Sequence, residues 1–245
     1  MTEHLTIRIS AGFNAEVMLA GLLSLTDQSS GTATAALKSL FPNTCATVEL
    51  EKTSVNSIAG TRAKLVVPGQ SHGHTHRQLS DIYSFYDKES RLGEGAAEIV
   101  ERIWNTLAAA EGRVHGTTPE RVHFHEVGRD SNILAIALIA TFIDRLKLSV
   151  SSSPIPVADG VIRCAHGLVP NPAPAMMAML AGVSVVPFAG TGEPVTPTGL
   201  AILLGLGATF GPWPAMRITR EALCYGRATF EGVPSGTRFI LGELE

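Results

Sequence analysis

The sequence is poor in cysteine, in charge runs and in long apolar runs. Its three cysteines, Cys45, Cys164 and Cys224, are far apart and form no CxxC pair, which argues against a disulfide framework and a structural zinc cluster. The 19 basic and 22 acidic residues leave a formal charge of −3 without any long block of one sign. The longest apolar run, residues 133–143, is too short to cross a bilayer. We therefore expect no nucleic-acid partner and no membrane partner.

The remaining composition indicates a folded chain. Apolar residues make up 45% of the 245 residues, which is enough for a substantial core in one large domain or two small ones. The first ten residues lack a basic start followed by an apolar run, so we expect no signal peptide and a soluble, cytoplasmic protein.

Hydrophobic periodicity predicts a mixed α/β (α+β) class, with helices and strands interleaved in a compact domain. A boundary near residue 70 or residue 150 is possible on composition, because the C-terminal half is rich in proline and glycine. The expected strands are 5–9, 47–55, 58–67, 121–127, 150–157, 161–164, 183–188, 216–221 and 237–244. Three of the expected helices cover residues 32–40, 95–110 and 133–146. Two more begin after the candidate caps Asn14 and Ser80, and the last two begin near Asn171-Pro172 and Thr196-Pro197.

Histidines are the most unevenly distributed residues of the chain. Three of the eight, His72, His74 and His76, alternate in the polar loop 68–77. Neutral imidazoles in such a loop can converge on a borderline metal ion such as nickel or zinc. A solvated polar loop explains the same composition.

The segment VHFHEV carries the sharper signal. In a strand, His123 and His125 point to one face and Phe124 to the other, so the two imidazoles could share an ion or a substrate phosphate. Glu126 joins them only if the strand ends or bulges before Gly128. The alternative is a pair of core histidines bonded to backbone carbonyls.

Three further positions could contribute to a site. His115 follows a predicted helix at a turn in which Gly116 suits the C′ position, and it could simply complement the helix dipole. His166 precedes a glycine in a loop, where an ordinary surface histidine is the simpler interpretation. Thr196 and Thr198 begin a helix whose free amides and hydroxyls could bind a phosphate or carboxylate, although a well-capped helix start would look the same.

Several of these segments together resemble the nickel insertion family usually called LarC. The resemblance rests on AAAEGRVHG, VHFHEVG, SPIPVADGVIRCAHGLVPNPAPA and GEPVTPTGLAIL, and extends to NSIAGTR, HGHTH, RQLSDI and TRFILGE. It implies insertion of Ni²⁺ into a pyridinium bisthiocarboxylate mononucleotide, coupled to CTP hydrolysis with Mn²⁺ or Mg²⁺, during synthesis of a nickel-pincer cofactor. The enzyme class it implies is a CTP-dependent nickel chelatase.

These observations define the candidate site residues. We expect catalytic roles for His123, His125, Glu126 and Asp130. We expect His115, His166, Thr196 and Thr198 to bind the cofactor. We expect His72, His74, His76, His123 and His125 to bind metal.

The sequence also departs from the family pattern. Arg8 stands near an expected aspartate, Ala15-Glu16-Val17 replaces a glycine–aspartate–methionine run, and only Asp130 remains of two aspartates after HEVG, with Ala135 at the other position. Lost carboxylates weaken a site for hard cations. The family's C-terminal domain is also absent from this chain and could be supplied by a separate chain.

Two alternatives to nickel insertion therefore remain. One is a metal-binding or storage protein. The other is a different enzyme acting on a nucleotide phosphate with His123, His125 and Asp130. A homo-oligomer is compatible with each.

Overall fold

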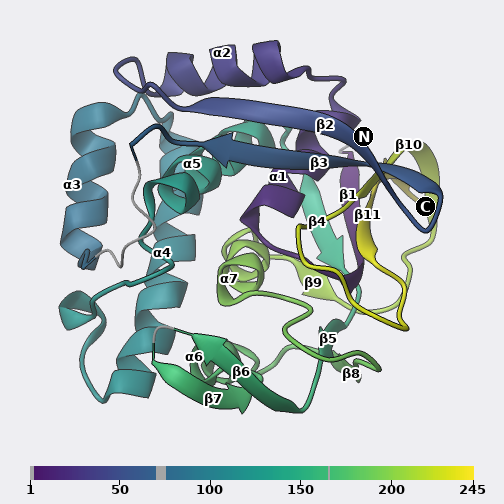
Figure 1. Cartoon of the computed structure of the whole chain (residues 1–245). Coiled ribbons are helices and arrows are strands. Elements are labelled where there is room, and N and C mark those ends of the chain that lie inside the picture. Colours follow the sequence, from purple (N-terminus) through teal and green to yellow (C-terminus); the bar gives the residue numbers. More distant parts are fainter. Residues whose placement is uncertain (1–2, 70–75, 165) are drawn as a thin grey trace.

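The structure is a computed structural model that describes residues 3–69, 76–164 and 166–245. His72 and His74 lie outside the described residues, so the loop histidines are represented by His76 alone. Helices and strands interleave along the chain, which confirms the mixed α/β class (Figure 1).

The elements have the following bounds. The strands are β1 (His4–Ala11), β2 (Thr47–Val55), β3 (Ile58–Val66), β4 (Ser149–Ser152), β5 (Ile155–Val157), β6 (Gly160–Cys164), β7 (Gly167–Asn171), β8 (Val185–Pro187), β9 (Thr209–Phe210), β10 (Met216–Cys224) and β11 (Gly236–Leu244). The helices are α1 (Ala15–Leu25), α2 (Ser30–Leu40), α3 (Leu79–Glu89), α4 (Glu94–His115), η1 (Pro119–Arg121, a 3₁₀ turn), α5 (Asp130–Leu146), α6 (Pro174–Met179) and α7 (Pro197–Gly205).

Within the described residues, the main sheet has seven strands in the order β2-β3-β10-β11-β1-β4-β9. Near its centre β1 pairs antiparallel with β11 and parallel with β4, so strands from the two ends of the chain are neighbours. Leu5, Ile7 and Ile9 alternate along β1 and are all buried, as their spacing predicts. The main sheet contains strands that precede and strands that follow residues 70 and 150, the two positions at which a domain boundary is possible on composition.

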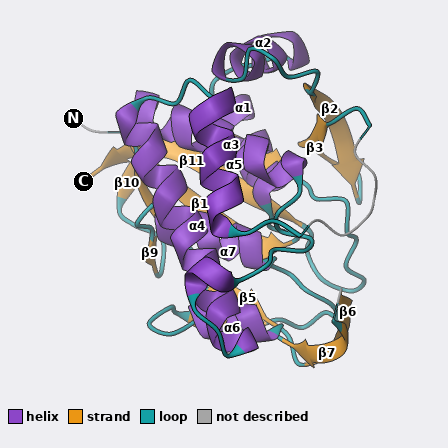
Figure 2. Cartoon of the chain, turned by 90° about the vertical axis from the view of Figure 1, so that its left-hand side faces the viewer, coloured by secondary structure: helices purple, strands orange, loops and turns teal. Residues whose placement is uncertain are grey.

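A layer of helices stands in front of the sheet in Figure 2. Helix α1 contacts β3, β10 and β11, α5 and α7 contact α1, and the long α4 packs against both α5 and α7. Helix α5 buries side chains around nearly its whole circumference, as its sequence predicts. The far end of α4 contacts α6, next to the β6–β7 hairpin at the bottom of Figure 1.

Local turn and cap signals were accurate at several element ends. Asn14 caps α1 by accepting from the amide of Val17, and Thr196 caps α7 by accepting from the amide of Gly199. Asn56 and Ser57 both have positive φ in the β2–β3 turn, where the sequence predicts a hairpin. The cap of α3 is Gln78, with Asp81 completing a capping box, so the assignment to Ser80 was wrong.

Other predicted elements differ from the structure. Residues 121–127 form no continuous strand, and pair only through one isolated bridge between Phe124 and Arg77. The predicted strand 150–157 is two strands separated at residues 153–154, because Pro154 has no amide to donate. The helix expected near Asn171 begins at Pro174.

Among the described residues, no helix combines the length and the apolar character needed to cross a membrane.

Candidate functional site: a histidine row beside a charged cavity

Five histidines from four segments of the chain lie in one row. In order along it they are His123, His76, His125, His166 and His115, hereafter the histidine row. The ring centroids of His76 and His125 are 5.0 Å apart, those of His125 and His166 5.5 Å, and those of His166 and His115 5.0 Å. His123 lies 6.5 Å from His76 at the near end. Four of the rings are exposed and His125 is half-buried.

The spacing of the row suits metal ions held by two imidazoles at a time. Two imidazoles bound to one ion through metal–nitrogen bonds of about 2.0–2.1 Å have ring centres on the order of 5 Å apart. Within the described part of the chain, no three histidine, cysteine, aspartate or glutamate side chains are arranged to hold one ion together. The row is therefore a series of imidazole pairs whose ring centroids are spaced as those of two ligands of one ion would be.

The pair His123 and His125 is positioned by the core. Phe124 between them is buried, and its ring lies 5.4 Å from that of Trp104 of α4. Since side chains alternate in an extended segment, burying Phe124 directs both histidines to the opposite side. The alternation that suggested a strand therefore holds locally, although a strand does not form.

Arg77 holds the segment of His76 next to this pair. Its carbonyl accepts a hydrogen bond from the amide of Phe124 at 2.8 Å, and its guanidinium donates to the carbonyl of Gly128 at 3.2 Å. It also forms an ion pair with Asp130 at the start of α5. Asp130 thus fixes the neighbouring segment, and it lines a different, smaller hollow from the cavity described below.

We expect Asp130→Asn to weaken Ni²⁺ binding about fivefold, because losing roughly 1 kcal/mol of interaction with Arg77 loosens the placement of His76. Calorimetric titration with Ni²⁺ measures this. Asp144→Asn, which removes an ion pair with Lys147 at the far end of the same helix, is the matched control and should leave affinity unchanged. Equal affinities for the wild type and Asp130→Asn would show that the ion pair does not position the row.

The other end of the row is built on α4 and the β6–β7 hairpin. His115 lies in the last turn of α4, where Gly116 adopts the left-handed conformation with φ of 61° and ends the helix as predicted. The Nε2 atom of His115 lies 3.4 Å from Oε2 of Glu111. Burial raises the pKa of Glu111, and His115 and His166 act in the opposite direction. Cys164 adds a sulfur 3.9 Å from Nδ1 of His166.

A cavity of about 460 Å³ adjoins the row at Glu126, the residue after His125. The N-terminal ends of α1, α5 and α7 all line it, with Asn14–Glu16 of the first, Arg129, Ser131 and Asn132 of the second, and Thr196–Thr198 of the third. Helix N-termini carry partial positive charge and unpaired amides, so three of them around one cavity favour an anionic ligand. The predicted anion site at Thr196 and Thr198 thus forms one part of a larger surface.

Backbone hydrogen bonds hold two of these helix ends together. The amide of Phe13 donates to the carbonyl of Pro194 at 2.9 Å, and the amide of Thr196 donates to the carbonyl of Phe13 at 3.0 Å. The close approach requires Gly199 in α7, because a Cβ there would lie 2.9 Å from the carbonyl oxygen of Phe13.

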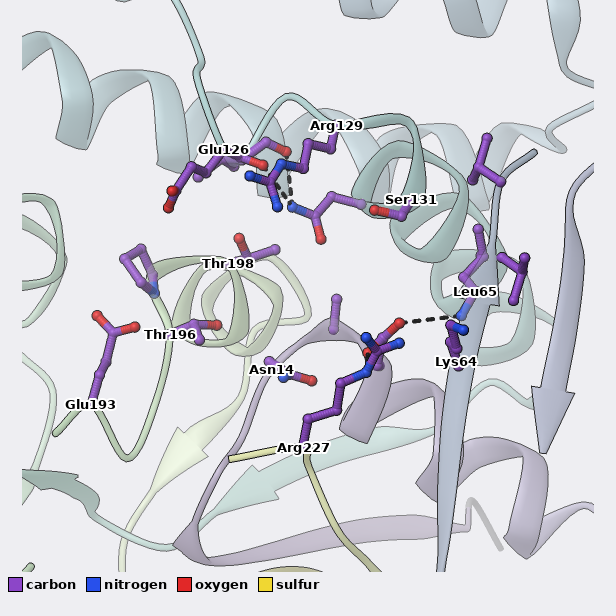
Figure 3. A pocket seen from close by; sticks show the side chains of 17 residues that line it. Asn14, Lys64, Leu65, Glu126, Arg129, Ser131, Glu193, Thr196, Thr198 and Arg227 are labelled. Atoms are coloured by element: carbon purple, nitrogen blue, oxygen red, sulfur yellow. Dashed lines mark hydrogen bonds and ion pairs between the residues drawn. The ribbon is translucent and has the colours of Figure 1, made fainter. Parts of the chain in front are cut away.

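Charged side chains divide the cavity into two ends (Figure 3). Glu126 and Glu193 lie on the left of that view, and Arg227 and Lys64 lie to the right. Arg129 lies above, and its Nε atom is buried without a hydrogen-bond partner among the described residues. Of these, only Glu126 was a predicted site residue.

Glu193 is the most perturbed carboxyl group of the cavity. Burial, with a further contribution from Glu126, raises its pKa to about 7. A carboxyl group that binds its proton more tightly in the folded protein makes the free energy of unfolding fall as pH rises between about 4.5 and about 7.

We therefore expect Glu193→Gln to flatten the pH dependence of stability. Relative to wild type, the variant should gain free energy of unfolding across that interval, by at most about 1.4 kcal/mol per pH unit. Urea unfolding at a series of pH values measures the difference. Parallel curves for the two proteins would mean that Glu193 titrates normally.

The chain is similar to known proteins over nearly its whole length. Residues 5–245 match the family model described as nickel insertion protein. A putative nickel insertion protein of Geobacter metallireducens is 37% identical over 96% of this chain and 60% of its own length. One from Geobacter sulfurreducens is 39% identical over 84% of the chain and 52% of its length.

A relative with a more specific name comes from Geobacillus kaustophilus. The pyridinium-3,5-bisthiocarboxylic acid mononucleotide nickel insertion protein of that organism is 40% identical over 71% of this chain and 42% of its own length. The chain thus spans about 60% or less of these relatives. No solved structure matches.

Proposed function

Because the chain belongs to the nickel insertion protein family, we propose that it inserts Ni²⁺ into a pyridinium bisthiocarboxylate mononucleotide during synthesis of a nickel-pincer cofactor. One observation carries the proposal: a row of histidines suited to nickel and a cavity suited to an anionic nucleotide are joined by consecutive residues. His125 belongs to the row, and Glu126, its neighbour in sequence, lines the cavity.

The row would supply the nickel. Imidazole nitrogens bind Ni²⁺ well, and positions with two protein ligands leave the remaining coordination sites open to a substrate. An ion held by His125 with His76 or with His166 can exchange one imidazole for a substrate sulfur. The two thiocarboxylates would then take over coordination, which removes the need for a cysteine cluster in the protein.

The cavity would hold the mononucleotide. A volume of about 460 Å³ falls within the range of small-molecule sites. The helix N-termini and the three cationic side chains, Lys64, Arg129 and Arg227, offset the negative charge of the phosphate and the thiocarboxylates.

We include in this proposal the coupling to CTP hydrolysis with Mn²⁺ or Mg²⁺ that the resemblance to the family implies. These hard cations prefer clusters of oxygen ligands, and the described residues contain no group of three side chains placed to hold one ion. The oxygen ligands among the described residues therefore do not fit such an ion. We assign the nucleotide-dependent step to a C-terminal domain, in the same protein or on a separate chain.

Calorimetric titration distinguishes insertion from the alternatives. We expect Ni²⁺ to bind at one equivalent or more, and the mononucleotide substrate to remove it. Metal that stays bound in the presence of substrate would indicate storage. Binding of nucleotides without binding of Ni²⁺ would indicate a different enzyme on this scaffold.

A further inference from the structure

We propose that the cavity orients its ligand: the phosphate monoester of the mononucleotide binds at the end formed by Lys64, Arg227 and the first turn of α1, and the pyridinium ring faces Glu126 and Glu193. This inference rests on the proposed function, since it names the way in which that substrate is held. It concerns residues from three separate elements that the sequence did not group.

The distribution of charge sets the direction. Glu126 and Glu193 lie on the left of the cavity in Figure 3, with Arg129 above them, so a phosphate dianion there would meet two carboxyl groups and one guanidinium. Arg227 and Lys64 lie at the other end. A phosphate dianion is therefore more stable at the second end. The ring with its two thiocarboxylates carries a net charge of about −1, so the carboxyl groups at the first end repel it less than they would repel the phosphate.

The end of the cavity formed by Lys64 and Arg227, hereafter the cationic end, has a positive charge comparable in size to the negative charge of one phosphate monoester. Glu16 lies 3.5 Å from Nε of Arg227 and also accepts a hydrogen bond from the amide of Leu65 at 3.2 Å. Lys64 and Arg227 together with Glu16 leave a net charge of about +1, to which the first amides of α1 add a partial positive charge. A phosphate monoester carries about −1.5 to −2 at neutral pH, whereas a triphosphate carries considerably more.

The opposite end brings the ring to the nickel. Glu126 follows His125 directly, so a ring that lies against Glu126 and Glu193 is at the end of the cavity where the chain leads into the histidine row. A ligand bound in the reverse direction would hold its thiocarboxylates at Lys64 and Arg227, away from the row. The first orientation therefore holds the sulfurs at the end of the cavity that His125 adjoins along the chain.

Two related compounds separate the contribution of the phosphate to binding affinity from that of the ring. Nicotinate mononucleotide carries a pyridinium ring and one phosphate, and nicotinate riboside lacks only the phosphate. We expect the wild-type chain to bind the mononucleotide at least about tenfold more tightly in calorimetry, because charge-assisted hydrogen bonds to the phosphate are lost in the riboside. Lys64→Ala and Arg227→Ala should each reduce that ratio severalfold, and the exposed Lys88→Ala should leave it unchanged.

Glu16→Gln is expected to raise the affinity for the mononucleotide, and a misfolded variant would not bind more tightly. The glutamine oxygen can still accept from Leu65, but Arg227 is released from its ion pair. We expect mononucleotide affinity to rise about threefold and riboside affinity to stay constant. Inorganic phosphate should compete with the mononucleotide.

The orientation would be overturned if the wild type bound the two probes with equal affinity. It would also be overturned if Lys64→Ala and Arg227→Ala lowered the affinities for both probes equally, or if these substitutions weakened CTP binding more than mononucleotide binding. Failure of wild type to bind the mononucleotide would also overturn it. Each can occur while Ni²⁺ binding by the histidine row is intact, so this inference can fail separately from the proposed function.

Discussion

Replacing His125 with alanine is expected to lower the affinity for Ni²⁺ by about 100-fold. His125 is the middle ring of the histidine row, 5.0 Å from His76 and 5.5 Å from His166. Its loss removes two of the three closest ring pairs and leaves only that of His166 with His115, whose ring also contacts Glu111. Changes in the surroundings of a metal ligand alone cost about 10–100-fold, and loss of the ligand itself belongs at the upper limit. Calorimetric titration with Ni²⁺ measures the loss.

His4 provides a matched control for this variant. It is a buried histidine of β1 that contacts the hydroxyls of Ser149 and Ser151 at 2.8 Å and lies outside the row. His4→Gln should keep wild-type affinity for Ni²⁺. If His125→Ala binds the ion as tightly as His4→Gln does, nickel is held somewhere other than the row.

Replacing Trp104 with alanine is expected to lower the free energy of unfolding by about 3–5 kcal/mol. The side chain is fully buried, its Nε1 donates to the hydroxyl of Tyr86 at 3.0 Å, and its ring contacts Phe124. Tyr86 in turn donates to the carbonyl of Ile133 in α5 at 2.8 Å. The substitution therefore opens a cavity directly beneath His123 and His125.

Trp104→Phe separates packing from hydrogen bonding. It retains an aromatic ring against Phe124 and loses the donor to Tyr86, so we expect a smaller loss of about 1–2 kcal/mol in urea unfolding. Ni²⁺ affinity should follow the same order, with the alanine variant weaker than the phenylalanine variant. Identical affinities in both variants and wild type would mean that Phe124 does not need this support to place the histidines.

The sequence predicted those parts of the fold that depend on neighbouring residues. Asn14 and Thr196 were recognisable as helix caps because the signal lies within one turn of the chain. The segment 121–127 was predicted as a strand because His123, Phe124 and His125 do alternate. Most of its backbone nevertheless forms no ladder, since its one bridge is to Arg77, a partner that periodicity cannot indicate.

In the candidate site too, some residues could be predicted from local motifs and others could not. Four histidines of the row were predicted from ordered motifs and one from the polar loop, but their order along the row depends on packing between α4, the β6–β7 hairpin and residues 122–125. Lys64 and Arg227 carried no local signal, because each becomes part of the cavity only when distant segments fold together. Glu193 could have been found, since it stands in the same GTGEPVTPTGLA segment as Thr196.

Transfer of nickel from protein to substrate tests the central claim most directly. The chain is loaded with one equivalent of Ni²⁺ and freed of unbound metal. It is then mixed with the pyridinium bisthiocarboxylate mononucleotide, CTP, Mg²⁺ and the C-terminal domain of a longer relative, and the nickel-containing product is followed by mass spectrometry. If the histidine row delivers nickel to a ligand in the adjoining cavity, the wild type forms product and His125→Ala loaded with the same amount of nickel forms far less. Equal product from the two proteins, or nickel that stays on the wild-type protein, would contradict the account.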